Sequence, residues 1–518
     1  MKIDKKAAVF FGFIFLIGAF FFIYRLDSRI LWEDESATAN LAVNILKYGI
    51  PLGDDGKNRL IFNVSNDLNE DSIWVLSPWL SEYLTAGSFA IFGKSEFAAR
   101  LPFAVLGFLS VIFLFYVVWD IFKDRQLALL SLLLSVTSEV LILHSRQCRY
   151  YAVSVFMQVL FIFAFYLLLQ RKRIGIVYMF IALTCQFYSS YLFVPGNLLL
   201  AVTAGFILRK KYPGVFGDLI IAAVIVSSLG LIWVIYAKLW NQTQYIGITS
   251  YYEKLLFYIM QINMTMFPLL LLLLLLVFYR KSDFVVNSIS RDMMFFILAI
   301  IPFQIVFIIN YFTFFLRYII ILVPVFIVLQ SLILRRSPPL LRYTIAGILC
   351  LTNFIGYTGL ISFKAFMATR PRFEIQRPRV TLKDIFMERV TPYVNRSGEV
   401  IAFLNKNTLP GQSLLACGSE FPVIFYTQLK VINLHKLKGQ LTSNPDWIFP
   451  QSVSGMNEYV TGKKCNIAEN SEFLKQNYEP VIIEVHNSWL AGSVADPDMY
   501  EYFTTAEKIP LIAYKKKG

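Results

Sequence analysis

The chain has 518 residues, of which 57% are hydrophobic and 16% charged, whereas an average soluble domain has about 45–50% apolar residues, glycine included, and about 25% charged residues. These proportions exclude a soluble globular protein and predict that most of the chain lies in a lipid bilayer. The net charge of +14 does not come from basic blocks interleaved with base-stacking aromatics, so it indicates membrane topology and no nucleic-acid partner.

The N-terminus predicts a retained first transmembrane helix. Lys2, Lys5 and Lys6 precede an apolar run over 7–26, and no small-residue cleavage site follows. About 20 apolar residues cross a bilayer core of roughly 30 Å, so we expect about eleven spans and an all-α polytopic membrane protein. The predicted spans are 7–26, 98–122, 127–144, 150–170, 174–192, 193–208, 217–239, 258–279, 293–311, 316–334 and 342–362.

Basic residues between the spans predict which side of the membrane each connection faces. If the N-terminus is cytoplasmic, alternate connections are cytoplasmic too, and cytoplasmic loops carry the excess of lysine and arginine. We therefore expect Lys172 and Lys210 to face the cytoplasm of a bacterial inner (plasma) membrane, and Lys94, Lys464 and the C-terminal portion to lie outside. The basic residues on the alternate connections are Lys123 and Arg125, 171–173, 209–211, 280–281 with Arg291, and 335–336.

The segment 77–93 is apolar enough to be mistaken for a further span. Glu82 interrupts it, Lys94 and Glu96 follow it, and counting it would move the basic clusters outside. We therefore predict an interfacial helix here. The first outer loop then covers 27–97, and loops of that length usually carry function.

Three consecutive acids stand at the start of this loop. Glu33, Asp34 and Glu35 follow Trp32 and precede an amphipathic stretch over 37–48, which ends at Gly-Ile-Pro. Acids held by a surface helix at the lip of an outer cavity could act as a general base or bind a metal. Acids beside a span are more often a solvated helix end.

Arginines near later spans depart from the positive-inside pattern. Arg146, Arg149 and Arg317 lie at predicted outer ends of spans, and guanidinium groups suit phosphate oxygens. Each could instead reach lipid headgroups, but three on one side favour phosphate. Glu139, inside the third predicted span, is either a functional group or the partner of an arginine such as Arg146. His144 is either a proton carrier or a structural donor.

The amino-acid composition changes in the last portion of the chain. From about Val380 charge returns, and short strand-like runs alternate with helical ones, which predicts a small α/β domain with a mostly parallel sheet. The predicted domains are 1–364 in the membrane and 365–518 outside it. Cys417 and Cys465 could form a disulfide there. The predicted strands are 413–417, 431–434, 446–449, 481–484 and 511–514, with a helix over 422–426.

Four blocks of sequence carry a family resemblance. They read WEDESATANLAVNILKYGIP, SPWLSEYLTAGSFAIFGKSEFAARLP, HSRQCRYYAVSVF with its Ser-Arg-x-x-Arg-x-Tyr pattern, and FLRYIIILVPVF. Together they resemble the membrane glycosyltransferases of the GT-C class, in the branch of bacterial aminoarabinose transferases and protein O-mannosyltransferases. Leu76-Ser77 stands where aminoarabinose transferases have Glu-Lys, which argues against an identical reaction. No loop is long enough for the inserted outer domain of eukaryotic O-mannosyltransferases.

The resemblance implies a glycosyltransferase that takes a sugar from a polyprenyl-phosphate donor and transfers it, with inversion, to an extracytoplasmic lipid, glycan or protein acceptor. In this interpretation Asp34 is the base and Glu35 a second acid, and a divalent cation between them is an open alternative. The donor phosphate would be bound by Arg146, Arg149 and Arg317, with Glu139, His144 and Tyr151 as accessory residues.

Two other classes of protein share a comparable number of spans. Transporters and lipid flippases tend to have paired halves with interrupted helices, and the sequence shows no internal repeat. Polysaccharide polymerases and ligases usually have their large outer loop late among the spans, whereas here it is early. The sequence leaves the sugar and the acceptor open.

Overall fold

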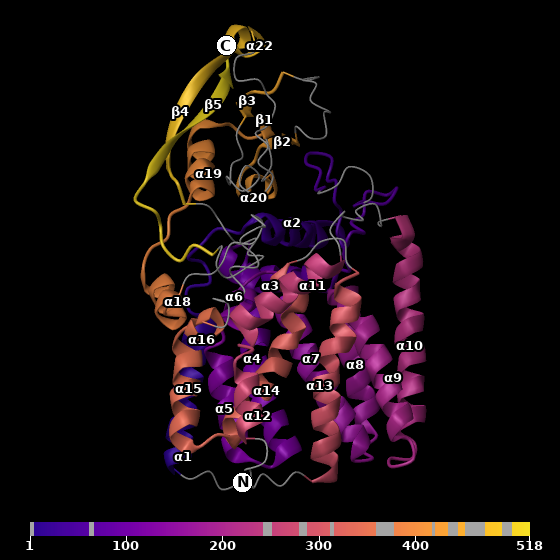
Figure 1. The fold of residues 1–518 in the computed structure, drawn as a ribbon. Helices are drawn as coiled ribbons and strands as arrows, with labels where there is room; N and C mark the ends of the chain where they lie inside the picture. Colours follow the sequence, from indigo (N-terminus) through magenta and orange to yellow (C-terminus); the bar gives the residue numbers. More distant parts are fainter. Residues whose placement is uncertain are drawn as a thin grey trace.

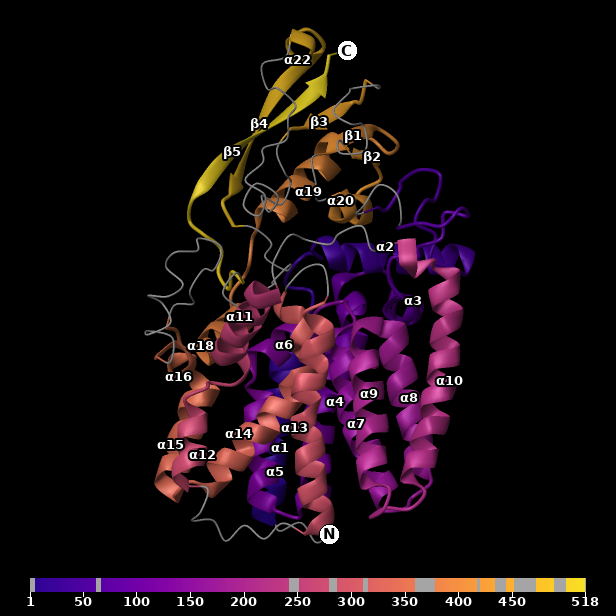
Figure 2. The ribbon, with the colours of Figure 1, turned by 45° about the vertical axis from the view of Figure 1, so that its right-hand side comes forward.

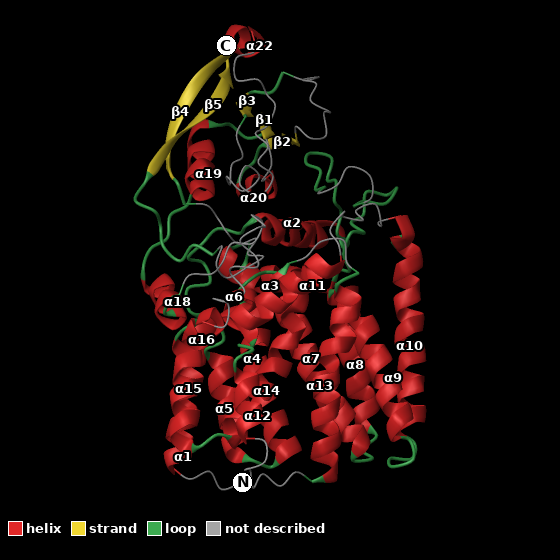
Figure 3. Cartoon of the chain, in the orientation of Figure 1, coloured by secondary structure: helices red, strands yellow, loops and turns green. Residues whose placement is uncertain are grey.

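The computed structural model describes residues 5–61, 67–241, 251–278, 287–310, 315–358, 378–416, 420–433, 444–450, 472–488 and 500–517. A bundle of helices forms one end of the molecule and a small sheet the other, and the N-terminus lies at the end far from the sheet (Figure 1). The colouring by secondary structure separates the two parts clearly (Figure 3). The predicted domain boundary at 364/365, Cys417, Cys465 and Lys464 lie outside the described residues.

The bundle is mostly helical, as expected for a polytopic membrane protein. Its helices are α1 (Lys5–Ile23), α4 (Glu96–Phe122), α5 (Arg125–Val136), α6 (Glu139–Ser145), α7 (Tyr151–Leu169), α8 (Ile174–Ser189), α9 (Val194–Leu208), α10 (Val215–Tyr236), α11 (Tyr251–Gln261), α12 (Leu271–Phe278), α13 (Ser288–Ile308), α14 (Val323–Arg336), α15 (Pro339–Leu351) and α16 (Phe354–Thr358). The short helical turns η1 (Tyr191–Phe193), η2 (Leu239–Asn241), η3 (Ile262–Met266) and η5 (Leu316–Leu322) join some of them.

In the part of the chain that the structure describes, fewer helices than the predicted eleven are long enough to span a membrane. In the described part of the chain six helices are long and apolar enough, or seven if the bent pair α5 and α6 forms one span. Three shorter apolar helices, Gly12–Ile23, Ile174–Ser189 and Pro339–Leu351, fall on predicted spans. The multi-pass architecture is therefore confirmed, and the count of eleven stays a prediction.

Two predicted spans are interrupted. The run 127–144 bends by 56° between α5 and α6. The run 258–279 passes from α11 into η3 and then leaves the helix at Phe267, whose backbone is extended. Proline follows at position 268, and the residue before a proline is pushed out of the helical region. Hydropathy alone does not reveal either interruption.

A cluster of buried amides links helices inside the bundle. Asn197 of α9 donates to Gln158 of α7 at 2.7 Å and to Gln186 of α8 at 2.8 Å. Gln304 of α13 donates to Asn197 at 2.8 Å. All four side chains are fully buried. Hydrogen bonds of this kind hold transmembrane helices together, because the hydrophobic effect does not distinguish a neighbouring helix from lipid tails.

The first outer loop forms two surface helices. α2 (Glu33–Tyr48) lies across the end of the bundle, and α3 (Leu80–Phe92) packs beside it (Figure 1). α2 ends where Gly49 adopts φ +80° and its N–H bonds to the Ile45 carbonyl, a left-handed cap that glycine favours. α3 matches the predicted interfacial helix and is not among the candidate membrane spans.

The C-terminal portion contains a mixed sheet of five strands in the order β2-β1-β3-β5-β4. β1 pairs in parallel with β2 and β3, whereas β5 pairs antiparallel with β3 and β4. The prediction of a mostly parallel sheet was therefore wrong for its last two strands. The elements are α18 (Thr381–Val390), α19 (Arg396–Asn407), β1 (Ser413–Ala416), α20 (Glu420–Tyr426), β2 (Lys430–Asn433), β3 (Trp447–Phe449), α22 (Glu472–Asn477), β4 (Tyr478–His486) and β5 (Lys508–Lys516).

The sheet region sits directly on the first outer loop. Figure 2 shows α20 above α2, with α19 beside α20. The Asn40 side chain of α2 donates to the Phe421 carbonyl at 3.0 Å, and the Tyr426 hydroxyl accepts from the Leu31 N–H at 2.8 Å. Residues more than 380 positions apart therefore meet across this boundary.

Candidate functional site

The three consecutive acids occupy the first turn of α2, which lies across the end of the bundle nearest the sheet. Carboxylates are favoured at a helix N-terminus because the unpaired N–H groups carry partial positive charge. Although adjacent in sequence, Asp34 and Glu35 lie in different environments. The turn of about 100° between successive helical residues directs their side chains to different neighbours.

Asp34 meets two of the predicted arginines. Its Oδ2 lies 2.8 Å from Nη1 of Arg317 and 3.7 Å from Nη2 of Arg149. Arg149 also donates to the Thr38 hydroxyl at 3.1 Å. The Asp34 side chain is 14% exposed and the two arginines are 16–17% exposed. The fold thus brings together one acid and two guanidinium groups that are far apart in the sequence.

Aromatic side chains surround the two guanidinium groups. The Arg317 guanidinium lies 4.4 Å from the centre of the Phe315 ring, and that of Arg149 lies 5.7 Å from the centre of the Tyr150 ring. Tyr151 is buried and packs edge-on against the His144 ring, with centroids 5.1 Å apart. Cation–π contacts of this kind stabilise buried positive charge.

His144 forms a hydrogen bond within its own helix. Its Nδ1 lies 2.9 Å from the Val140 carbonyl, one helical turn earlier. Its buried Nε2 has no hydrogen-bond partner among the described residues. This geometry fits the structural donor, one of the two interpretations that the sequence left open.

Glu35 is buried in an ion pair with Arg100. Arg100 of α4 donates to both of its carboxylate oxygens, at 2.8 and 2.7 Å, and the Cys148 N–H donates at 2.8 Å. Glu35 is only 1% exposed. The expected position of Glu35 beside Asp34, where it could act as a second acid or share a cation, is therefore corrected: it anchors the helix start.

Arg146 and Glu139 also lie elsewhere than the sequence suggested. Arg146 donates to the carbonyls of Tyr24 at 2.8 Å and Arg25 at 2.9 Å, just after α1. Glu139 pairs with Arg379 at 2.8 Å and accepts a hydrogen bond from the Tyr502 hydroxyl. These contacts direct Arg146 and Glu139 to other partners than Asp34, which pairs with Arg149 and Arg317.

Arg100 was missed by the sequence analysis, although a signal for it was present. It is a charged residue inside the predicted span 98–122, and such residues are functional or structural candidates by default. Its guanidinium also donates to the carbonyls of Leu26, Arg29 and Ile30, at 2.7–3.0 Å. Arg100 thus fixes the segment that leads into α2.

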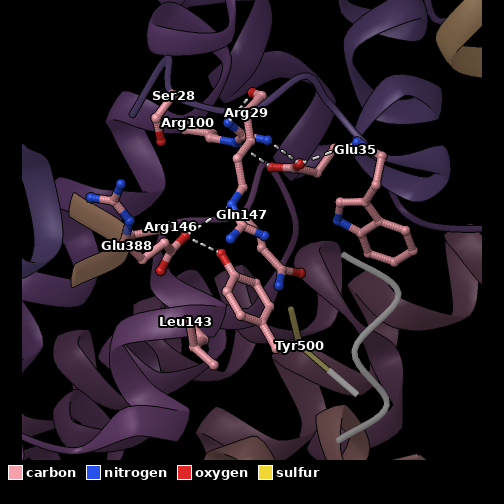
Figure 4. A pocket seen from close by; sticks show the side chains of 10 residues that line it. Ser28, Arg29, Glu35, Arg100, Leu143, Arg146, Gln147, Glu388 and Tyr500 are labelled. Atoms are coloured by element: carbon pink, nitrogen blue, oxygen red, sulfur yellow. Dashed lines mark hydrogen bonds and ion pairs between the residues drawn. The ribbon is translucent and has the colours of Figure 1, made fainter. Parts of the chain in front are cut away.

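The segment before α2 is also held by the C-terminal portion. The Arg29 guanidinium lies 3.7 Å from the centre of the Tyr393 ring and 4.4 Å from that of Tyr500, and its Nε is 3.1 Å from Glu388. Burial acts to raise the pKa of Glu388, but Arg389 and Arg29 hold it at about 2. Figure 4 shows Arg29, Glu388 and Tyr500 lining one cavity together with Arg100 and Glu35.

Glu82 of α3 is a second buried acid near this site. It is 2% exposed, and its Oε2 has no hydrogen-bond partner among the described residues. Burial raises the pKa of Glu82 from 4.5 to about 7, although the positive charge of Arg149 acts in the opposite direction. The folded protein therefore holds this proton more tightly than the unfolded chain does.

This shift predicts a pH dependence of stability. A carboxyl group whose pKa is raised on folding stabilises the native state fully below pH 4.5, and that contribution is lost as the pH rises to about 7. At pH 8 the loss amounts to roughly 3 kcal/mol. Glu82→Gln should therefore raise the unfolding temperature at pH 8 and change it little at pH 4.5, measured by thermal unfolding of the purified protein. The same change at exposed Glu472 is the control, and an unaltered pH profile in Glu82→Gln would contradict the assignment.

No metal centre is evident in the part of the chain that the structure describes. No group of three or more His, Cys, Asp and Glu side chains there has an arrangement that could hold a metal ion. The Asp34 and Glu35 carboxylates are each oriented toward a different arginine.

Comparison with known proteins finds similarity in sequence and in fold. A family model described as dolichyl-phosphate-mannose-protein mannosyltransferase matches residues 77–233, a segment that includes Glu82, Arg100 and Arg149. None of the curated proteins compared with the chain matches it.

The fold is similar to that of ArnT from Cupriavidus metallidurans. Its apo crystal structure is 13% identical in sequence, with a TM-score of 0.56 over 93% of this chain and 94% of ArnT. The structure of ArnT bound to undecaprenyl phosphate is 12% identical, with a TM-score of 0.55 over 99% and 98% of the two chains. The resemblance to GT-C class membrane glycosyltransferases is thereby confirmed.

Proposed function

We propose that this protein is a membrane glycosyltransferase that transfers a sugar from a polyprenyl-phosphate donor to an acceptor at the membrane face beneath the sheet. The observation that carries the proposal is the placement of Asp34 between Arg317 and Arg149 at the outer end of the bundle. The match of the mannosyltransferase family model and the likeness to an ArnT structure bound to undecaprenyl phosphate support the donor class.

The arrangement suits transfer from a phosphate-linked donor. Without donor, Asp34 pairs with both guanidinium groups. A donor phosphate would take over those contacts, since guanidinium groups bind phosphate oxygens strongly. The Asp34 carboxylate would then be available to accept a proton.

The reaction would proceed as one displacement with inversion at the anomeric carbon. An acceptor hydroxyl attacks this carbon, its proton passes to Asp34, and the bond between the carbon and the phosphate oxygen breaks. Polyprenyl phosphate leaves, stabilised by Arg149 and Arg317. Tyr151 and His144 form the wall behind the arginines, whereas Glu35, Arg146 and Glu139 hold the surrounding segments.

The direct test is donor consumption by the purified full-length protein. A panel of polyprenyl-phosphate sugars would be supplied with a membrane extract as the source of acceptor, and the release of polyprenyl phosphate would be measured. Release that depends on the sugar and disappears in Asp34→Asn supports the proposal. If no donor in the panel is consumed by folded protein that binds polyprenyl phosphate, the proposed activity is wrong.

The two arginines should affect donor binding more than folding. Arg149→Ala and Arg317→Ala each remove a charge-assisted contact to phosphate, which corresponds to about 1.5–3 kcal/mol, or roughly 10- to 150-fold in donor affinity. Binding of radiolabelled polyprenyl phosphate measures this loss. Arg173→Ala, in the exposed turn between α7 and α8, should bind like the wild type. Wild-type affinity in both test variants would assign these arginines to lipid headgroups.

The proposal includes an orientation in the inner membrane, with domain 1–364 in the bilayer and domain 365–518 outside. The turn between α9 and α10, which carries Lys210, lies at the same end of the bundle as the N-terminus (Figures 1 and 2). This common position agrees with the expectation that basic connections share the cytoplasmic side.

Cysteine labelling tests this orientation. Single cysteines at Lys172, Lys210, Lys94 and Lys406, in a background without the native cysteines, would be treated with an impermeant thiol reagent in intact cells. We expect labelling at Lys94 and at Lys406 of α19, and none at the other two until the membrane is opened. Labelling of the Lys172 site in intact cells would reverse the orientation.

A further inference from the structure

Three helix interruptions meet around one cavity beside Glu139, the first residue of α6. α5 and α6 are separated at Thr137–Ser138, η3 gives way to α12 around Pro268, and α15 and α16 are separated at Thr352–Asn353. All three interruptions line the same cavity, together with α14. Thr381, the first residue of α18, also lines the cavity, so the cavity lies where the helical bundle meets the C-terminal portion.

The cavity wall offers hydrogen-bond acceptors. The Thr265 hydroxyl donates to the Gln261 carbonyl at 2.7 Å, and the Thr381 hydroxyl donates to the Leu351 carbonyl at 3.3 Å. A hydroxyl group has one proton and two lone pairs, so both oxygens can still accept. The Gln330 amide nitrogen donates to the Met266 carbonyl at 2.7 Å, which leaves its carbonyl oxygen available.

The wall lacks the groups that recognise anions. None of the lining residues is lysine or arginine, and the acid among them, Glu139, already pairs with Arg379. The other lining residues include the polar Thr137, Ser138, Thr352 and Asn353 and apolar residues such as Met264, Val323 and Leu349. A phosphate or carboxylate ligand would therefore be poorly matched. A neutral group that has several O–H donors and also C–H surface matches both parts of the wall.

We propose that this cavity binds a neutral polyhydroxylated group, a sugar ring or a glycerol moiety, either free or as the headgroup of a membrane lipid. The cavity is distinct from the candidate active site, because Asp34, Arg149 and Arg317 do not line it. Binding there does not depend on the proposed transfer reaction, and the test below does not measure transfer.

The test uses matched probes on the full chain, purified in a detergent without hydroxylated headgroups such as lauryldimethylamine oxide. Octyl β-D-glucoside and 1-O-octylglycerol carry neutral hydroxyls, octyl phosphate carries the same tail with an anionic headgroup, and methyl β-D-glucoside has no tail. Each is titrated below its micellar concentration while the unfolding temperature is followed. We expect saturable stabilisation by octyl glucoside or octylglycerol and none by octyl phosphate.

Two conservative variants localise the site. Thr265→Val and Thr381→Val keep the side-chain shape but remove the acceptor oxygen, and each should raise the half-saturating concentration about fivefold, or about 25-fold together. Thr408→Val is the control, since it removes an equivalent bond to the Leu404 carbonyl in the C-terminal portion. If the double variant does not fold, the two single variants carry the test.

The outcomes separate the sources of the ligand. Stabilisation by methyl glucoside as well as by the tailed probes indicates a free sugar, and stabilisation by tailed probes alone indicates a lipid headgroup. Equal stabilisation by octyl phosphate, no saturable effect of either neutral tailed probe, or wild-type half-saturation in the threonine variants would each overturn the proposal.

Discussion

Asp34→Asn is expected to lower turnover by about 10²- to 10⁴-fold, because the amide keeps the shape of the carboxylate but cannot accept the proton of the acceptor. Donor affinity should stay the same or increase. Asp34 pairs with Arg149 and Arg317 in the free protein, and the uncharged amide would leave both guanidinium groups more available to phosphate. Single-turnover rates and polyprenyl-phosphate binding, measured on the same preparation, separate the two effects.

The neighbouring acid supplies a matched control. Glu33→Gln changes the adjacent residue of the same helical turn and should retain most of the turnover, because Glu33 is outside the matching Asp-Glu pair of the family motif. A folded Asp34→Asn protein with wild-type turnover would show that Asp34 is not the base. The acid cluster would then be only a favourable helix start.

The second large effect concerns stability. Glu35→Ala leaves the Arg100 guanidinium, which is 7% exposed, without its carboxylate partner. Removing one partner of a buried ion pair typically costs about 3–5 kcal/mol, because the remaining charge is desolvated and unpaired. The unfolding temperature should fall accordingly, and the turnover of the molecules that stay folded should fall as well, since α2 loses the anchor of its first turn.

A double variant distinguishes the loss of the ion pair between Glu35 and Arg100 from the loss of either side chain by itself. Glu35→Ala combined with Arg100→Met removes both charges, and the combined destabilisation should be smaller than the sum of the two single effects. Glu70→Gln, in the exposed ion pair with Lys238, should leave stability unchanged. Additive effects at Glu35 and Arg100 would mean that their pairing contributes nothing to the fold.

Much of the candidate site could be predicted because its residues stand out locally. Asp34 belongs to an acidic run before an amphipathic stretch, and Arg149 and Arg317 lie at predicted outer ends of spans, where basic residues are expected to be rare. The different roles of Asp34 and Glu35, and of Arg146 and Arg149, could not be predicted from the sequence. Glu35 differs from Asp34, and Arg146 from Arg149, only through the partners that the tertiary fold supplies.

The fold shows the same division between local and long-range information. All five strands were predicted, because β-propensity and alternation are local properties. The antiparallel pairing of β5 with β3 and β4 depends on contacts between residues far apart in the sequence. It was therefore not predicted. The departure from helix at Phe267 was marked by Pro268, but hydropathy outweighed that signal in the prediction of a span.

The contact between Arg29 and the end of the chain also affects when the protein can complete its folding during synthesis. Arg29 donates to the Glu501 carbonyl, a residue 472 positions later. At a synthesis rate of about 5–20 residues per second, roughly half a minute to a minute and a half separates their emergence from the ribosome. For most of that interval the segment before α2 lacks Glu388 and Tyr393, and Tyr500 arrives only at its end. The nascent protein would therefore be inserted in the membrane well before it is competent, and a chain truncated before these residues would stay in that immature state.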